Sequence, residues 1–259
     1  MIHLEHVTKR FGGFTAVDDL NLHIAEGEIF GFLGPNGAGK TTTIRMMMGL
    51  LKPTAGRICL GGHDLAIAPL AAKAISTFVP DRPFVYEKLT GREFLHFVGG
   101  LYQMPDKLLQ TRAQEGLDFF HLVEWGDELI ETYSHGMKQR LVVASALLPD
   151  PQILVVDEPM VGMDPIGTRM FKALLRSLTL KGKTVFMSTH SLEVAEELCD
   201  RIGIILGGRL IALGTLDELQ RQAGTEERLE EIFLRLTAAP DMLEAIETLQ
   251  AATARKFRV

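Results

Sequence analysis

The sequence is poor in cysteine and tryptophan, with two cysteines and one tryptophan in 259 residues. Cys59 and Cys199 lie far apart and at no spacing that is typical of metal ligands. This scarcity argues against a disulfide-rich scaffold and against a zinc site, and it is typical of proteins from reducing compartments. We therefore expect two core thiols and no structural metal.

The sequence also lacks long apolar runs and an excess of basic residues. No run approaches the roughly 18 to 20 apolar residues that a membrane-spanning helix needs, and the N-terminal MIHLEHVTKRF carries charges where a secretory signal is apolar. We expect neither a membrane span nor a targeting peptide. The formal net charge of -6 gives no overall basic surface, so the composition does not favour nucleic-acid binding.

What is present is the ordinary composition of a folded protein, with 46% hydrophobic and 23% charged residues. Three apolar runs, at 29–33, 153–156 and 184–187, stop abruptly at glycine or polar residues. Such runs are typical of fully buried strands in a parallel sheet. Because ligands of open α/β sheets lie beyond the carboxyl ends of the strands, we expect these three ends to converge on one site.

Other segments show different periods. Apolar residues alternate over 2–7 and 17–24, which predicts two half-buried strands, whereas 42–51 and most of 90–148 have helical spacing. We interpret the second of these helical regions as an inserted subdomain. Gly207-Gly208 between apolar runs predicts a hairpin. Helices are expected from Leu216 onward, around 229–236, and over 242–249 beyond Pro240.

The strongest motif is the glycine-rich segment that follows the first buried strand and opens a helix. It has the order Gly, four residues, Gly, Lys and Thr, which indicates a phosphate-binding loop. Backbone N–H groups of such a loop and the positive end of the helix attract anions. Lys40 can reach terminal phosphates, and the Thr41 hydroxyl can ligate Mg2+. The expected nucleotide-binding residues are Asn36, Gly37, Ala38, Gly39, Lys40, Thr41 and Thr42.

Charged and polar residues close the other two buried strands. Asp157 is placed to hold Mg2+ through water, and Glu158, which points to the other side of the strand, could polarise a water molecule for attack on a phosphate. The alternative is a solvated strand end before the turn at Pro159. His190 ends the third strand, where sensing the phosphate or orienting water competes with a structural role.

A second helix start, within Tyr133-Ser134-His135-Gly136-Met137-Lys138-Gln139-Arg140, offers another possible anion site. Ser134 has the position of a helix N-cap, which is one explanation. The other is that its hydroxyl and the Gly136 backbone hold a phosphate. Sequence separation from Lys40 does not decide between them.

Taken together, these motifs resemble the ATP-binding cassette (ABC) ATPases, from the N-terminus to about Ala238. The resemblance rests on five segments in the family's order and spacing, which are GPNGAGKTT, YSHGMKQR, ILVVDEP, Gly162-Met163-Asp164 and Ser188-Thr189-His190. It implies an α/β fold with a P-loop NTPase core and a mostly parallel sheet, an antiparallel β-subdomain, and a helical subdomain inserted at about 83–148. The ATPase domain would span 1–238, and 239–259 would form a short C-terminal helical tail.

The resemblance also implies roles for individual residues. Phe11 would stack on adenine, Glu158 would be the catalytic base, and His190 would contact the terminal phosphate. In this family two cassettes meet head to tail, so Ser134, Gly136 and Met137 of one subunit would close over nucleotide bound at Lys40 of the other. Asp164 would lie at that interface. ATP and Mg2+ are the implied ligands, and Thr41, Asp157 and Asp81 the implied metal-binding residues.

Two departures from the family pattern point to a subgroup. Asp81 stands where most members have Gln, and the signature segment has His135 and Met137 where Gly and Gln or Glu are usual. Both features, and the segment LEEIFLRLTA at 229–238, are similar to ATPases of multidrug, antibiotic-resistance and sodium exporters. The shorter, charged Asp81 would change the metal geometry relative to an amide.

The resemblance therefore implies an ATPase subunit of an exporter, located in the cytoplasm on the inner face of the membrane. Its partners would be a membrane-spanning permease subunit, contacted around 82–102, and a second copy of the chain or a different cassette. A soluble cassette ATPase that acts on nucleic acid is the alternative, but the chain has no tandem cassette, coiled-coil insertion or long basic linker. A kinase with the same loop would leave the Ser134 segment unexplained.

Overall fold

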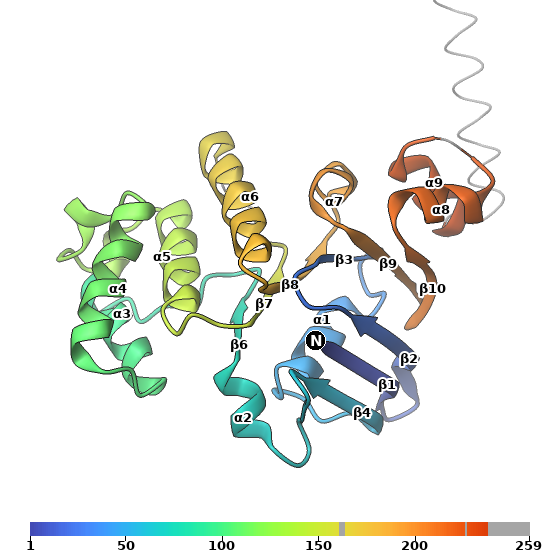
Figure 1. Cartoon of the computed structure of the whole chain (residues 1–259), viewed down its shortest axis with the longest axis horizontal. Helices are drawn as coiled ribbons and strands as arrows, with labels where there is room; N and C mark the ends of the chain where they lie inside the picture. The colour runs from blue at the N-terminus through green and yellow to red at the C-terminus, as the bar shows by residue number, and fades with distance from the viewer. Residues whose placement is uncertain (161–163, 226, 238–259) are drawn as a thin grey trace, which may run out of the picture.

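The computed structural model describes residues 1–160, 164–225 and 227–237, which form two sheets flanked by helices (Figure 1). A six-stranded sheet has the order β10-β9-β3-β8-β7-β6, and a four-stranded sheet has the order β2-β1-β4-β5. Their strands are β1 (Ile2–Phe11), β2 (Phe14–Ile24), β3 (Ile29–Leu33), β4 (Ala55–Leu60), β5 (His63–Asp64), β6 (Ser76–Val79), β7 (Ile153–Asp157), β8 (Thr184–Thr189), β9 (Arg201–Leu206) and β10 (Arg209–Gly214).

The three apolar runs form the centre of the larger sheet, as predicted. Strands β3, β7 and β8 are buried at every residue, and β8 pairs in parallel with both of the others. Burial on both faces explains why these strands read as continuous apolar runs. Their carboxyl ends lie at one edge of the sheet, next to the start of α1 (Lys40–Met47).

The smaller sheet contains the two alternating strands that were expected at the N-terminus. Strands β1 and β2 pair antiparallel across the Gly12-Gly13 turn, and their apolar residues face a common core. Strands β4 and β5 complete the sheet and were not predicted. The first three residues of β4 are exposed, and Gly56 has a φ of 88°, so this segment carries no regular alternation.

Helices between β6 and β7 form the inserted subdomain at one side of the molecule (Figure 1). They are α3 (Gly91–Leu101), α4 (Asp106–Phe119), the short 3-10 helices η1 (Val123–Trp125) and η2 (Ile130–Thr132), and α5 (His135–Leu147). Thr90 and Glu93 form a capping box at α3, and Ser134 caps α5. The helices share a core cluster with β7 and β8, which fixes the subdomain on the sheet.

The remaining helices surround the sheet and its hairpin. They are α2 (Pro69–Ala74), α6 (Pro165–Leu180), α7 (Leu192–Leu198), α8 (Leu216–Ala223) and α9 (Leu229–Thr237). The Gly207-Gly208 hairpin and the helices near 216 and 229 are confirmed. The helix expected at 42–51 instead runs from Lys40 to Met47, because the loop backbone turns into the helix directly after Gly39.

The fold class is thus confirmed, with its parallel core, antiparallel sheet and helical insertion. The predicted helix at 242–249 and the tail at 239–259 lie outside the described residues, and the domain limits stay a prediction. In the part of the chain that the structure describes, no helix combines the length and apolarity needed to cross a membrane.

Candidate nucleotide-binding site

A cavity of about 370 Å³ opens at the carboxyl ends of the central strands. The phosphate loop, the end of β7 and the start of β2 contribute its walls, so segments far apart in sequence meet there. Its lining residues are Phe14, Ala16, Asn36, Gly37, Gly39, Lys40, Thr41, Thr42, Asp81, Asp157 and Glu158.

The phosphate loop requires glycine for two physical reasons. Gly39 has a φ of 113°, and a Cβ at this position would lie 2.7 Å from the Ala16 carbonyl oxygen. Gly37 also has a positive φ, 79°, but a Cβ there would meet nothing within 4 Å. Gly39 therefore allows the loop to pack on β2, and Gly37 supplies the turn that wraps the loop around the start of α1. Such a loop presents backbone N–H groups to an anion.

Lys40 is the buried cation of the site. Its Nζ donates hydrogen bonds to the Gly34 carbonyl oxygen at 2.6 Å and to the Pro35 carbonyl oxygen at 3.2 Å. Burial lowers the pKa of Lys40, while the nearby Glu158 and Asp157 carboxylates oppose that shift. The loop backbone thus anchors the ammonium near the Glu158 and Asp157 carboxylates. This position places a positive charge at the cavity.

Asp157 is the most buried acid of the site, with 3% of its surface exposed. One of its carboxylate oxygens accepts a hydrogen bond from the Ser188 hydroxyl, and the other accepts one from Thr41 Oγ1 at 3.3 Å. Burial raises the pKa of Asp157, and the charges of Asp81 and Glu158 add to that effect. A buried carboxylate beside other acids is costly unless a cation or proton compensates it.

Glu158 and His190 form a pair next to this acid. His190 Nδ1 lies 2.8 Å from Glu158 Oε2, and the His190 backbone N–H donates to the same oxygen at 3.2 Å. Glu158 has a φ of 49°, which is uncommon for a residue with a side chain. Its own N–H donates to the Ser188 carbonyl oxygen at 3.1 Å, which holds this backbone conformation in place.

The aromatic residue on the cavity wall is Phe14 rather than Phe11. The Phe14 side chain is 64% exposed and lines the cavity, whereas Phe11 is 49% exposed, is not part of the lining, and has Lys9 Nζ 5.1 Å from its ring centroid. Sequence reasoning did not single out Phe14. Phe14 opens β2 opposite Phe11 in the hairpin register, a pairing that the structure shows and that no pattern of the sequence indicated.

The second predicted anion site lies apart from this cavity. Ser134, Gly136 and Met137 stand at the start of α5 and none of them lines the cavity. Ser134 Oγ accepts a hydrogen bond from the Met137 N–H at 3.3 Å, so the capping role is present. Asp164 caps α6 in the same way, accepting from the Gly167 N–H at 2.6 Å.

Two further predicted residues lie beside the cavity. Ala38 is buried in the phosphate loop, where its N–H donates to the Pro35 carbonyl oxygen. His190 faces a neighbouring cavity of about 340 Å³, which it lines together with residues 34–36 of the loop and Phe233 of α9. The structure thus brings together the phosphate loop, Asp81, Asp157, Glu158 and His190, and it leaves the Ser134 segment and Asp164 elsewhere on the surface.

The residues present fit a nucleotide with its magnesium ion. Thr41, Asp157 and Asp81 offer only oxygen donors, which Mg2+ prefers, and the uncompensated acid at Asp157 favours a cation there. Lys40 and the loop backbone offer positive charge to phosphates, and Phe14 offers an aromatic face.

Comparison with known proteins agrees with this geometry. Residues 17–161 match the family model described as ABC transporter. The chain is 40% identical over 223 residues to the daunorubicin resistance ATP-binding protein DrrA3 of Streptomyces coeruleorubidus, covering 86% of this chain and 71% of that protein. It is 41% identical over 213 residues to the Nod factor export ATP-binding protein I of Paraburkholderia xenovorans, covering 82% and 70%.

A solved structure is similar as well. It is a dimeric ATP-binding cassette in a post-hydrolysis state bound to ADP and Pi, with a TM-score of 0.76 and 28% identity over 83% of this chain and 99% of that one. The loop, the paired carboxylates and the histidine thus occur in a fold known to hold ATP's products. The chain belongs to the ABC transporter family, as an ATP-binding subunit that hydrolyses ATP.

Proposed function

We propose that the chain powers export through a separate membrane-spanning subunit, working as a head-to-tail pair of copies on the cytoplasmic face of the membrane. The observation that carries the pairing is the incomplete site. The cavity holds Lys40, Asp157 and Glu158, yet the Ser134–Met137 segment at the start of α5 does not reach it. A second copy could supply that segment to both sites at once, as a two-fold interface requires.

Within one copy, different residues bind the nucleotide, hold the metal ion and accept the proton. Lys40 and the loop backbone bind and orient the phosphates, and Phe14 or Phe11 stacks on the base. Thr41, Asp157 and Asp81 would hold Mg2+, which when bound neutralises phosphate charge. Glu158 accepts the proton of the attacking water, and its Oε2 is held by the ring and backbone nitrogens of His190.

The two-copy arrangement gives a role to each of the remaining predicted residues. Ser134, Gly136 and Met137 present a hydroxyl and helix N–H groups to the terminal phosphate on the partner copy. Asp164, which caps α6, would lie at the interface between the copies and connect the two sites. Closure therefore accompanies ATP binding, and hydrolysis allows the pair to reopen. The similar cassette, which is dimeric with bound ADP and Pi, supports the pairing of two copies around nucleotide.

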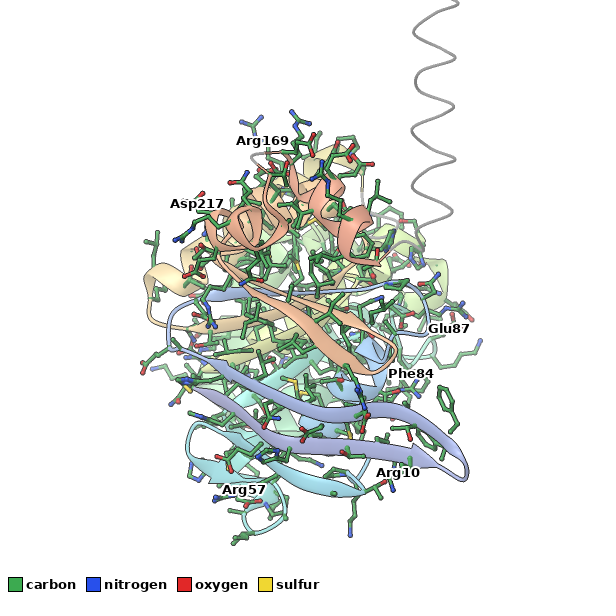
Figure 2. The ribbon with its side chains drawn as sticks, turned by 90° about the vertical axis from the view of Figure 1, so that its right-hand side faces the viewer. Arg10, Arg57, Phe84, Glu87, Arg169 and Asp217 are labelled. Carbon is green, nitrogen blue, oxygen red and sulfur yellow. The ribbon has the colours of Figure 1, made fainter. Side chains whose placement is uncertain are left out.

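An exposed aromatic cluster supports a membrane partner. Phe84, Tyr86 and Phe97 pack edge to face, with ring centroids 6.2 Å and 5.2 Å apart, and Phe84 is 77% exposed. Figure 2 shows Phe84 and Glu87 at the edge of the molecule. Exposed aromatic groups of this kind mark protein contacts, and this cluster lies in the segment where the family resemblance implies the permease. The relative named for Nod factor export supports the direction of transport.

The test is affinity capture of the tagged chain from gently solubilised membranes, with ATP hydrolysis assayed on the captured material. We expect a multi-spanning protein in stoichiometric amount and activity that disappears in Lys40→Ala. Substitution of Phe84 and Tyr86 by Ser should reduce the captured partner and leave ATP binding intact. Recovery only with ribosomes or DNA would contradict the proposal and favour a soluble cassette ATPase.

A further inference from the structure

Two buried polar side chains lack hydrogen-bond partners within the described residues. Gln139 is fully buried in α5, and neither its Nε2 nor its Oε1 is paired. Thr77 is 2% exposed in β6, and its Oγ1 is likewise unpaired. Buried polar groups are nearly always satisfied, so exceptions require an explanation. Neither residue has a part in the nucleotide site described above.

Neighbouring residues show that the fold can satisfy buried hydroxyls locally. Ser145, also in α5, donates to the Val142 carbonyl oxygen at 2.8 Å. Ser76, next to Thr77 in β6, donates to the Ala72 carbonyl oxygen at 2.8 Å. The lack of a hydrogen-bond partner is therefore specific to Gln139 and Thr77 and is not general to this helix or this strand.

The two positions lie on the two elements of the contact between α5 and β6, Gln139 on the helix and Thr77 on the strand. Thr77 pairs laterally with Leu154 of β7, and paired residues of adjacent strands point to the same face of a sheet. Leu154 belongs to the core cluster that also contains Leu141, Val142 and Val143 of α5. Thr77 thus faces the layer that α5 provides, and α5 packs directly on β6.

This contact joins the two halves of the catalytic arrangement. Gln139 lies in the first turns of α5, which begins at the Ser134 segment, and β6 runs into Asp81, which lines the nucleotide cavity. A small displacement of α5 over β6 would therefore move the Ser134 segment relative to Asp81. The two unpaired side chains lie on the two elements that such a displacement would shift relative to each other.

We propose that Gln139 and Thr77 are positioning residues, whose amide and hydroxyl pair with each other across the α5–β6 contact when the Ser134 segment closes on nucleotide bound by a second copy. The inference rests on the proposed function in taking that closure as the active state. In the arrangement described here the unpaired groups destabilise the fold. Their pairing in the closed state favours closure, because a state that gains interactions is populated at the expense of one that lacks them.

The test separates stability from turnover. Gln139→Met keeps a long unbranched side chain without the amide, and Thr77→Val keeps the shape without the hydroxyl. We expect each to raise the thermal midpoint of the nucleotide-free protein, since an unpaired buried group is removed, and to lower kcat about three- to tenfold, the factor that one hydrogen bond made only in the active state supplies. The affinity of the subunit for ATP should not change.

Three controls sharpen the result. The double variant should lose no more kcat than the stronger single variant, because both remove the same pair. Thr77→Ser keeps the hydroxyl and should retain kcat near that of the unmodified chain. Ser145→Ala removes a hydroxyl that is already satisfied on the same helix, and should lower the midpoint slightly while kcat is retained.

Two outcomes would overturn the inference. A lower midpoint in Gln139→Met and Thr77→Val would mean that the groups are already paired in the resting fold, for instance by a buried water molecule. An unchanged kcat in both would mean that they act in packing alone. Failure of the proposed function looks different, since the unmodified chain would then form no ATP-dependent pair of copies and would capture no membrane-spanning protein.

Discussion

The two ends of strand β7 carry aspartates in opposite environments. Asp157, its last residue, is buried, is held by two hydroxyls, and has a raised pKa because of that burial. Asp150, just before the strand, has 60% of its side chain exposed, pairs with Lys183, and lies 3.7 Å from Arg112. The Lys183 hydrogen bond lowers the pKa of Asp150. Among the described residues, Asp157 thus has no ion-pair partner within 4 Å, whereas Asp150 has two.

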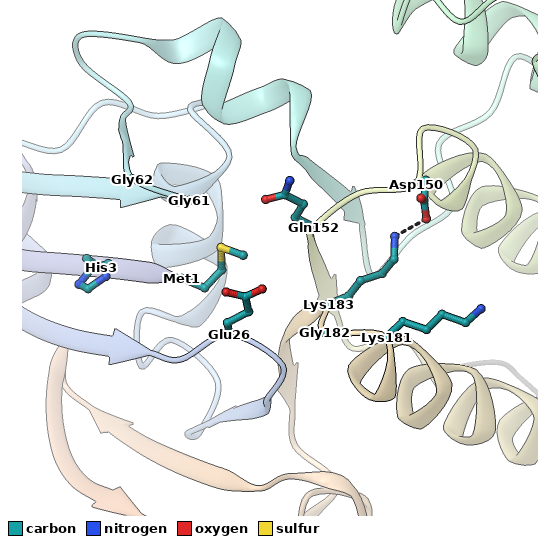
Figure 3. Close-up of a pocket in the computed structure, with 10 residues that line it drawn as sticks. All are labelled: Met1, His3, Glu26, Gly61, Gly62, Asp150, Gln152, Lys181, Gly182 and Lys183. Carbon is teal, nitrogen blue, oxygen red and sulfur yellow. Dashed lines mark hydrogen bonds and ion pairs between the residues drawn. The ribbon is translucent and has the colours of Figure 1, made fainter.

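The cavities at these ends differ in the same way. The one beside Asp150 is the larger, about 630 Å³ against 370 Å³, and Figure 3 shows Lys183 bridging to Asp150 on its wall. Two other charged side chains that line it, Glu26 and Lys181, are exposed. The comparison teaches that size does not identify the functional site. The functional site is identified instead by charged groups that converge on one cavity and have no ion-pair partner there to offset their charge.

The largest effect is expected from a test that replaces one glutamate by glutamine at each of the two cavities. Glu158→Gln should retain ATP binding, trap the closed pair, and lower turnover at least about a hundredfold, the range for loss of a general base. Glu26→Gln makes the same chemical change at the larger cavity and should leave turnover within about twofold, the scatter expected for a surface site. Steady-state ATPase assays with a binding titration distinguish them. Unchanged turnover in Glu158→Gln would show that another group takes the proton.

A second test concerns the aromatic wall of the smaller cavity. Stacking of a base on one ring contributes about 1–3 kcal/mol, so loss of the ring that contacts adenine should weaken ATP binding at least about fivefold. We expect this loss in Phe14→Ala, because Phe14 lines the cavity. Phe11→Ala should have the smaller effect. Fluorescence titration with a labelled nucleotide measures both, and the reverse order would restore Phe11 as the stacking residue that the family resemblance implies.

These residues show how far the sequence alone could lead. Buried strands such as 153–157 and the loop around Lys40 were predictable, because burial and phosphate binding impose strict local patterns. The convergence of Asp157 and Glu158 with Lys40 followed from the rule about strand ends.

Other features depend on contacts between segments that are distant in sequence. Strand β4 was missed because its pairing with β1 compensates for an exposed, glycine-containing start. The place of Phe14 depends on the hairpin's orientation over the phosphate loop, and the unpaired amide of Gln139 depends on which helix covers β6. Neither leaves a periodic signal in the chain.

A third prediction addresses the buried acid directly. A raised pKa means that the folded state holds its proton to higher pH than the unfolded state, so Asp157 reduces stability as pH rises from its ordinary pKa of 3.8 through the raised folded value. Asp157→Asn should therefore raise the thermal midpoint at pH 7 without Mg2+ or nucleotide, by roughly 2–4 °C if the gain is about 1 kcal/mol. The gain should vanish on acidification. A lower midpoint at pH 7 would mean that its hydrogen bonds outweigh its burial.

The smallest effect is expected at the opposite end of the strand, and it has the opposite sign. Asp150 has a lowered pKa, so its stabilisation is complete above 3.8 and is lost as pH falls through the folded value. Because the side chain is exposed, Asp150→Asn should lower the free energy of unfolding at pH 7 by only about 0.2–1 kcal/mol. Denaturant titration should show this loss shrinking in roughly 1 M salt, where exposed pairs are screened. If both aspartate variants changed stability in the same direction, the environments at the two ends of β7 would not differ as the geometry indicates.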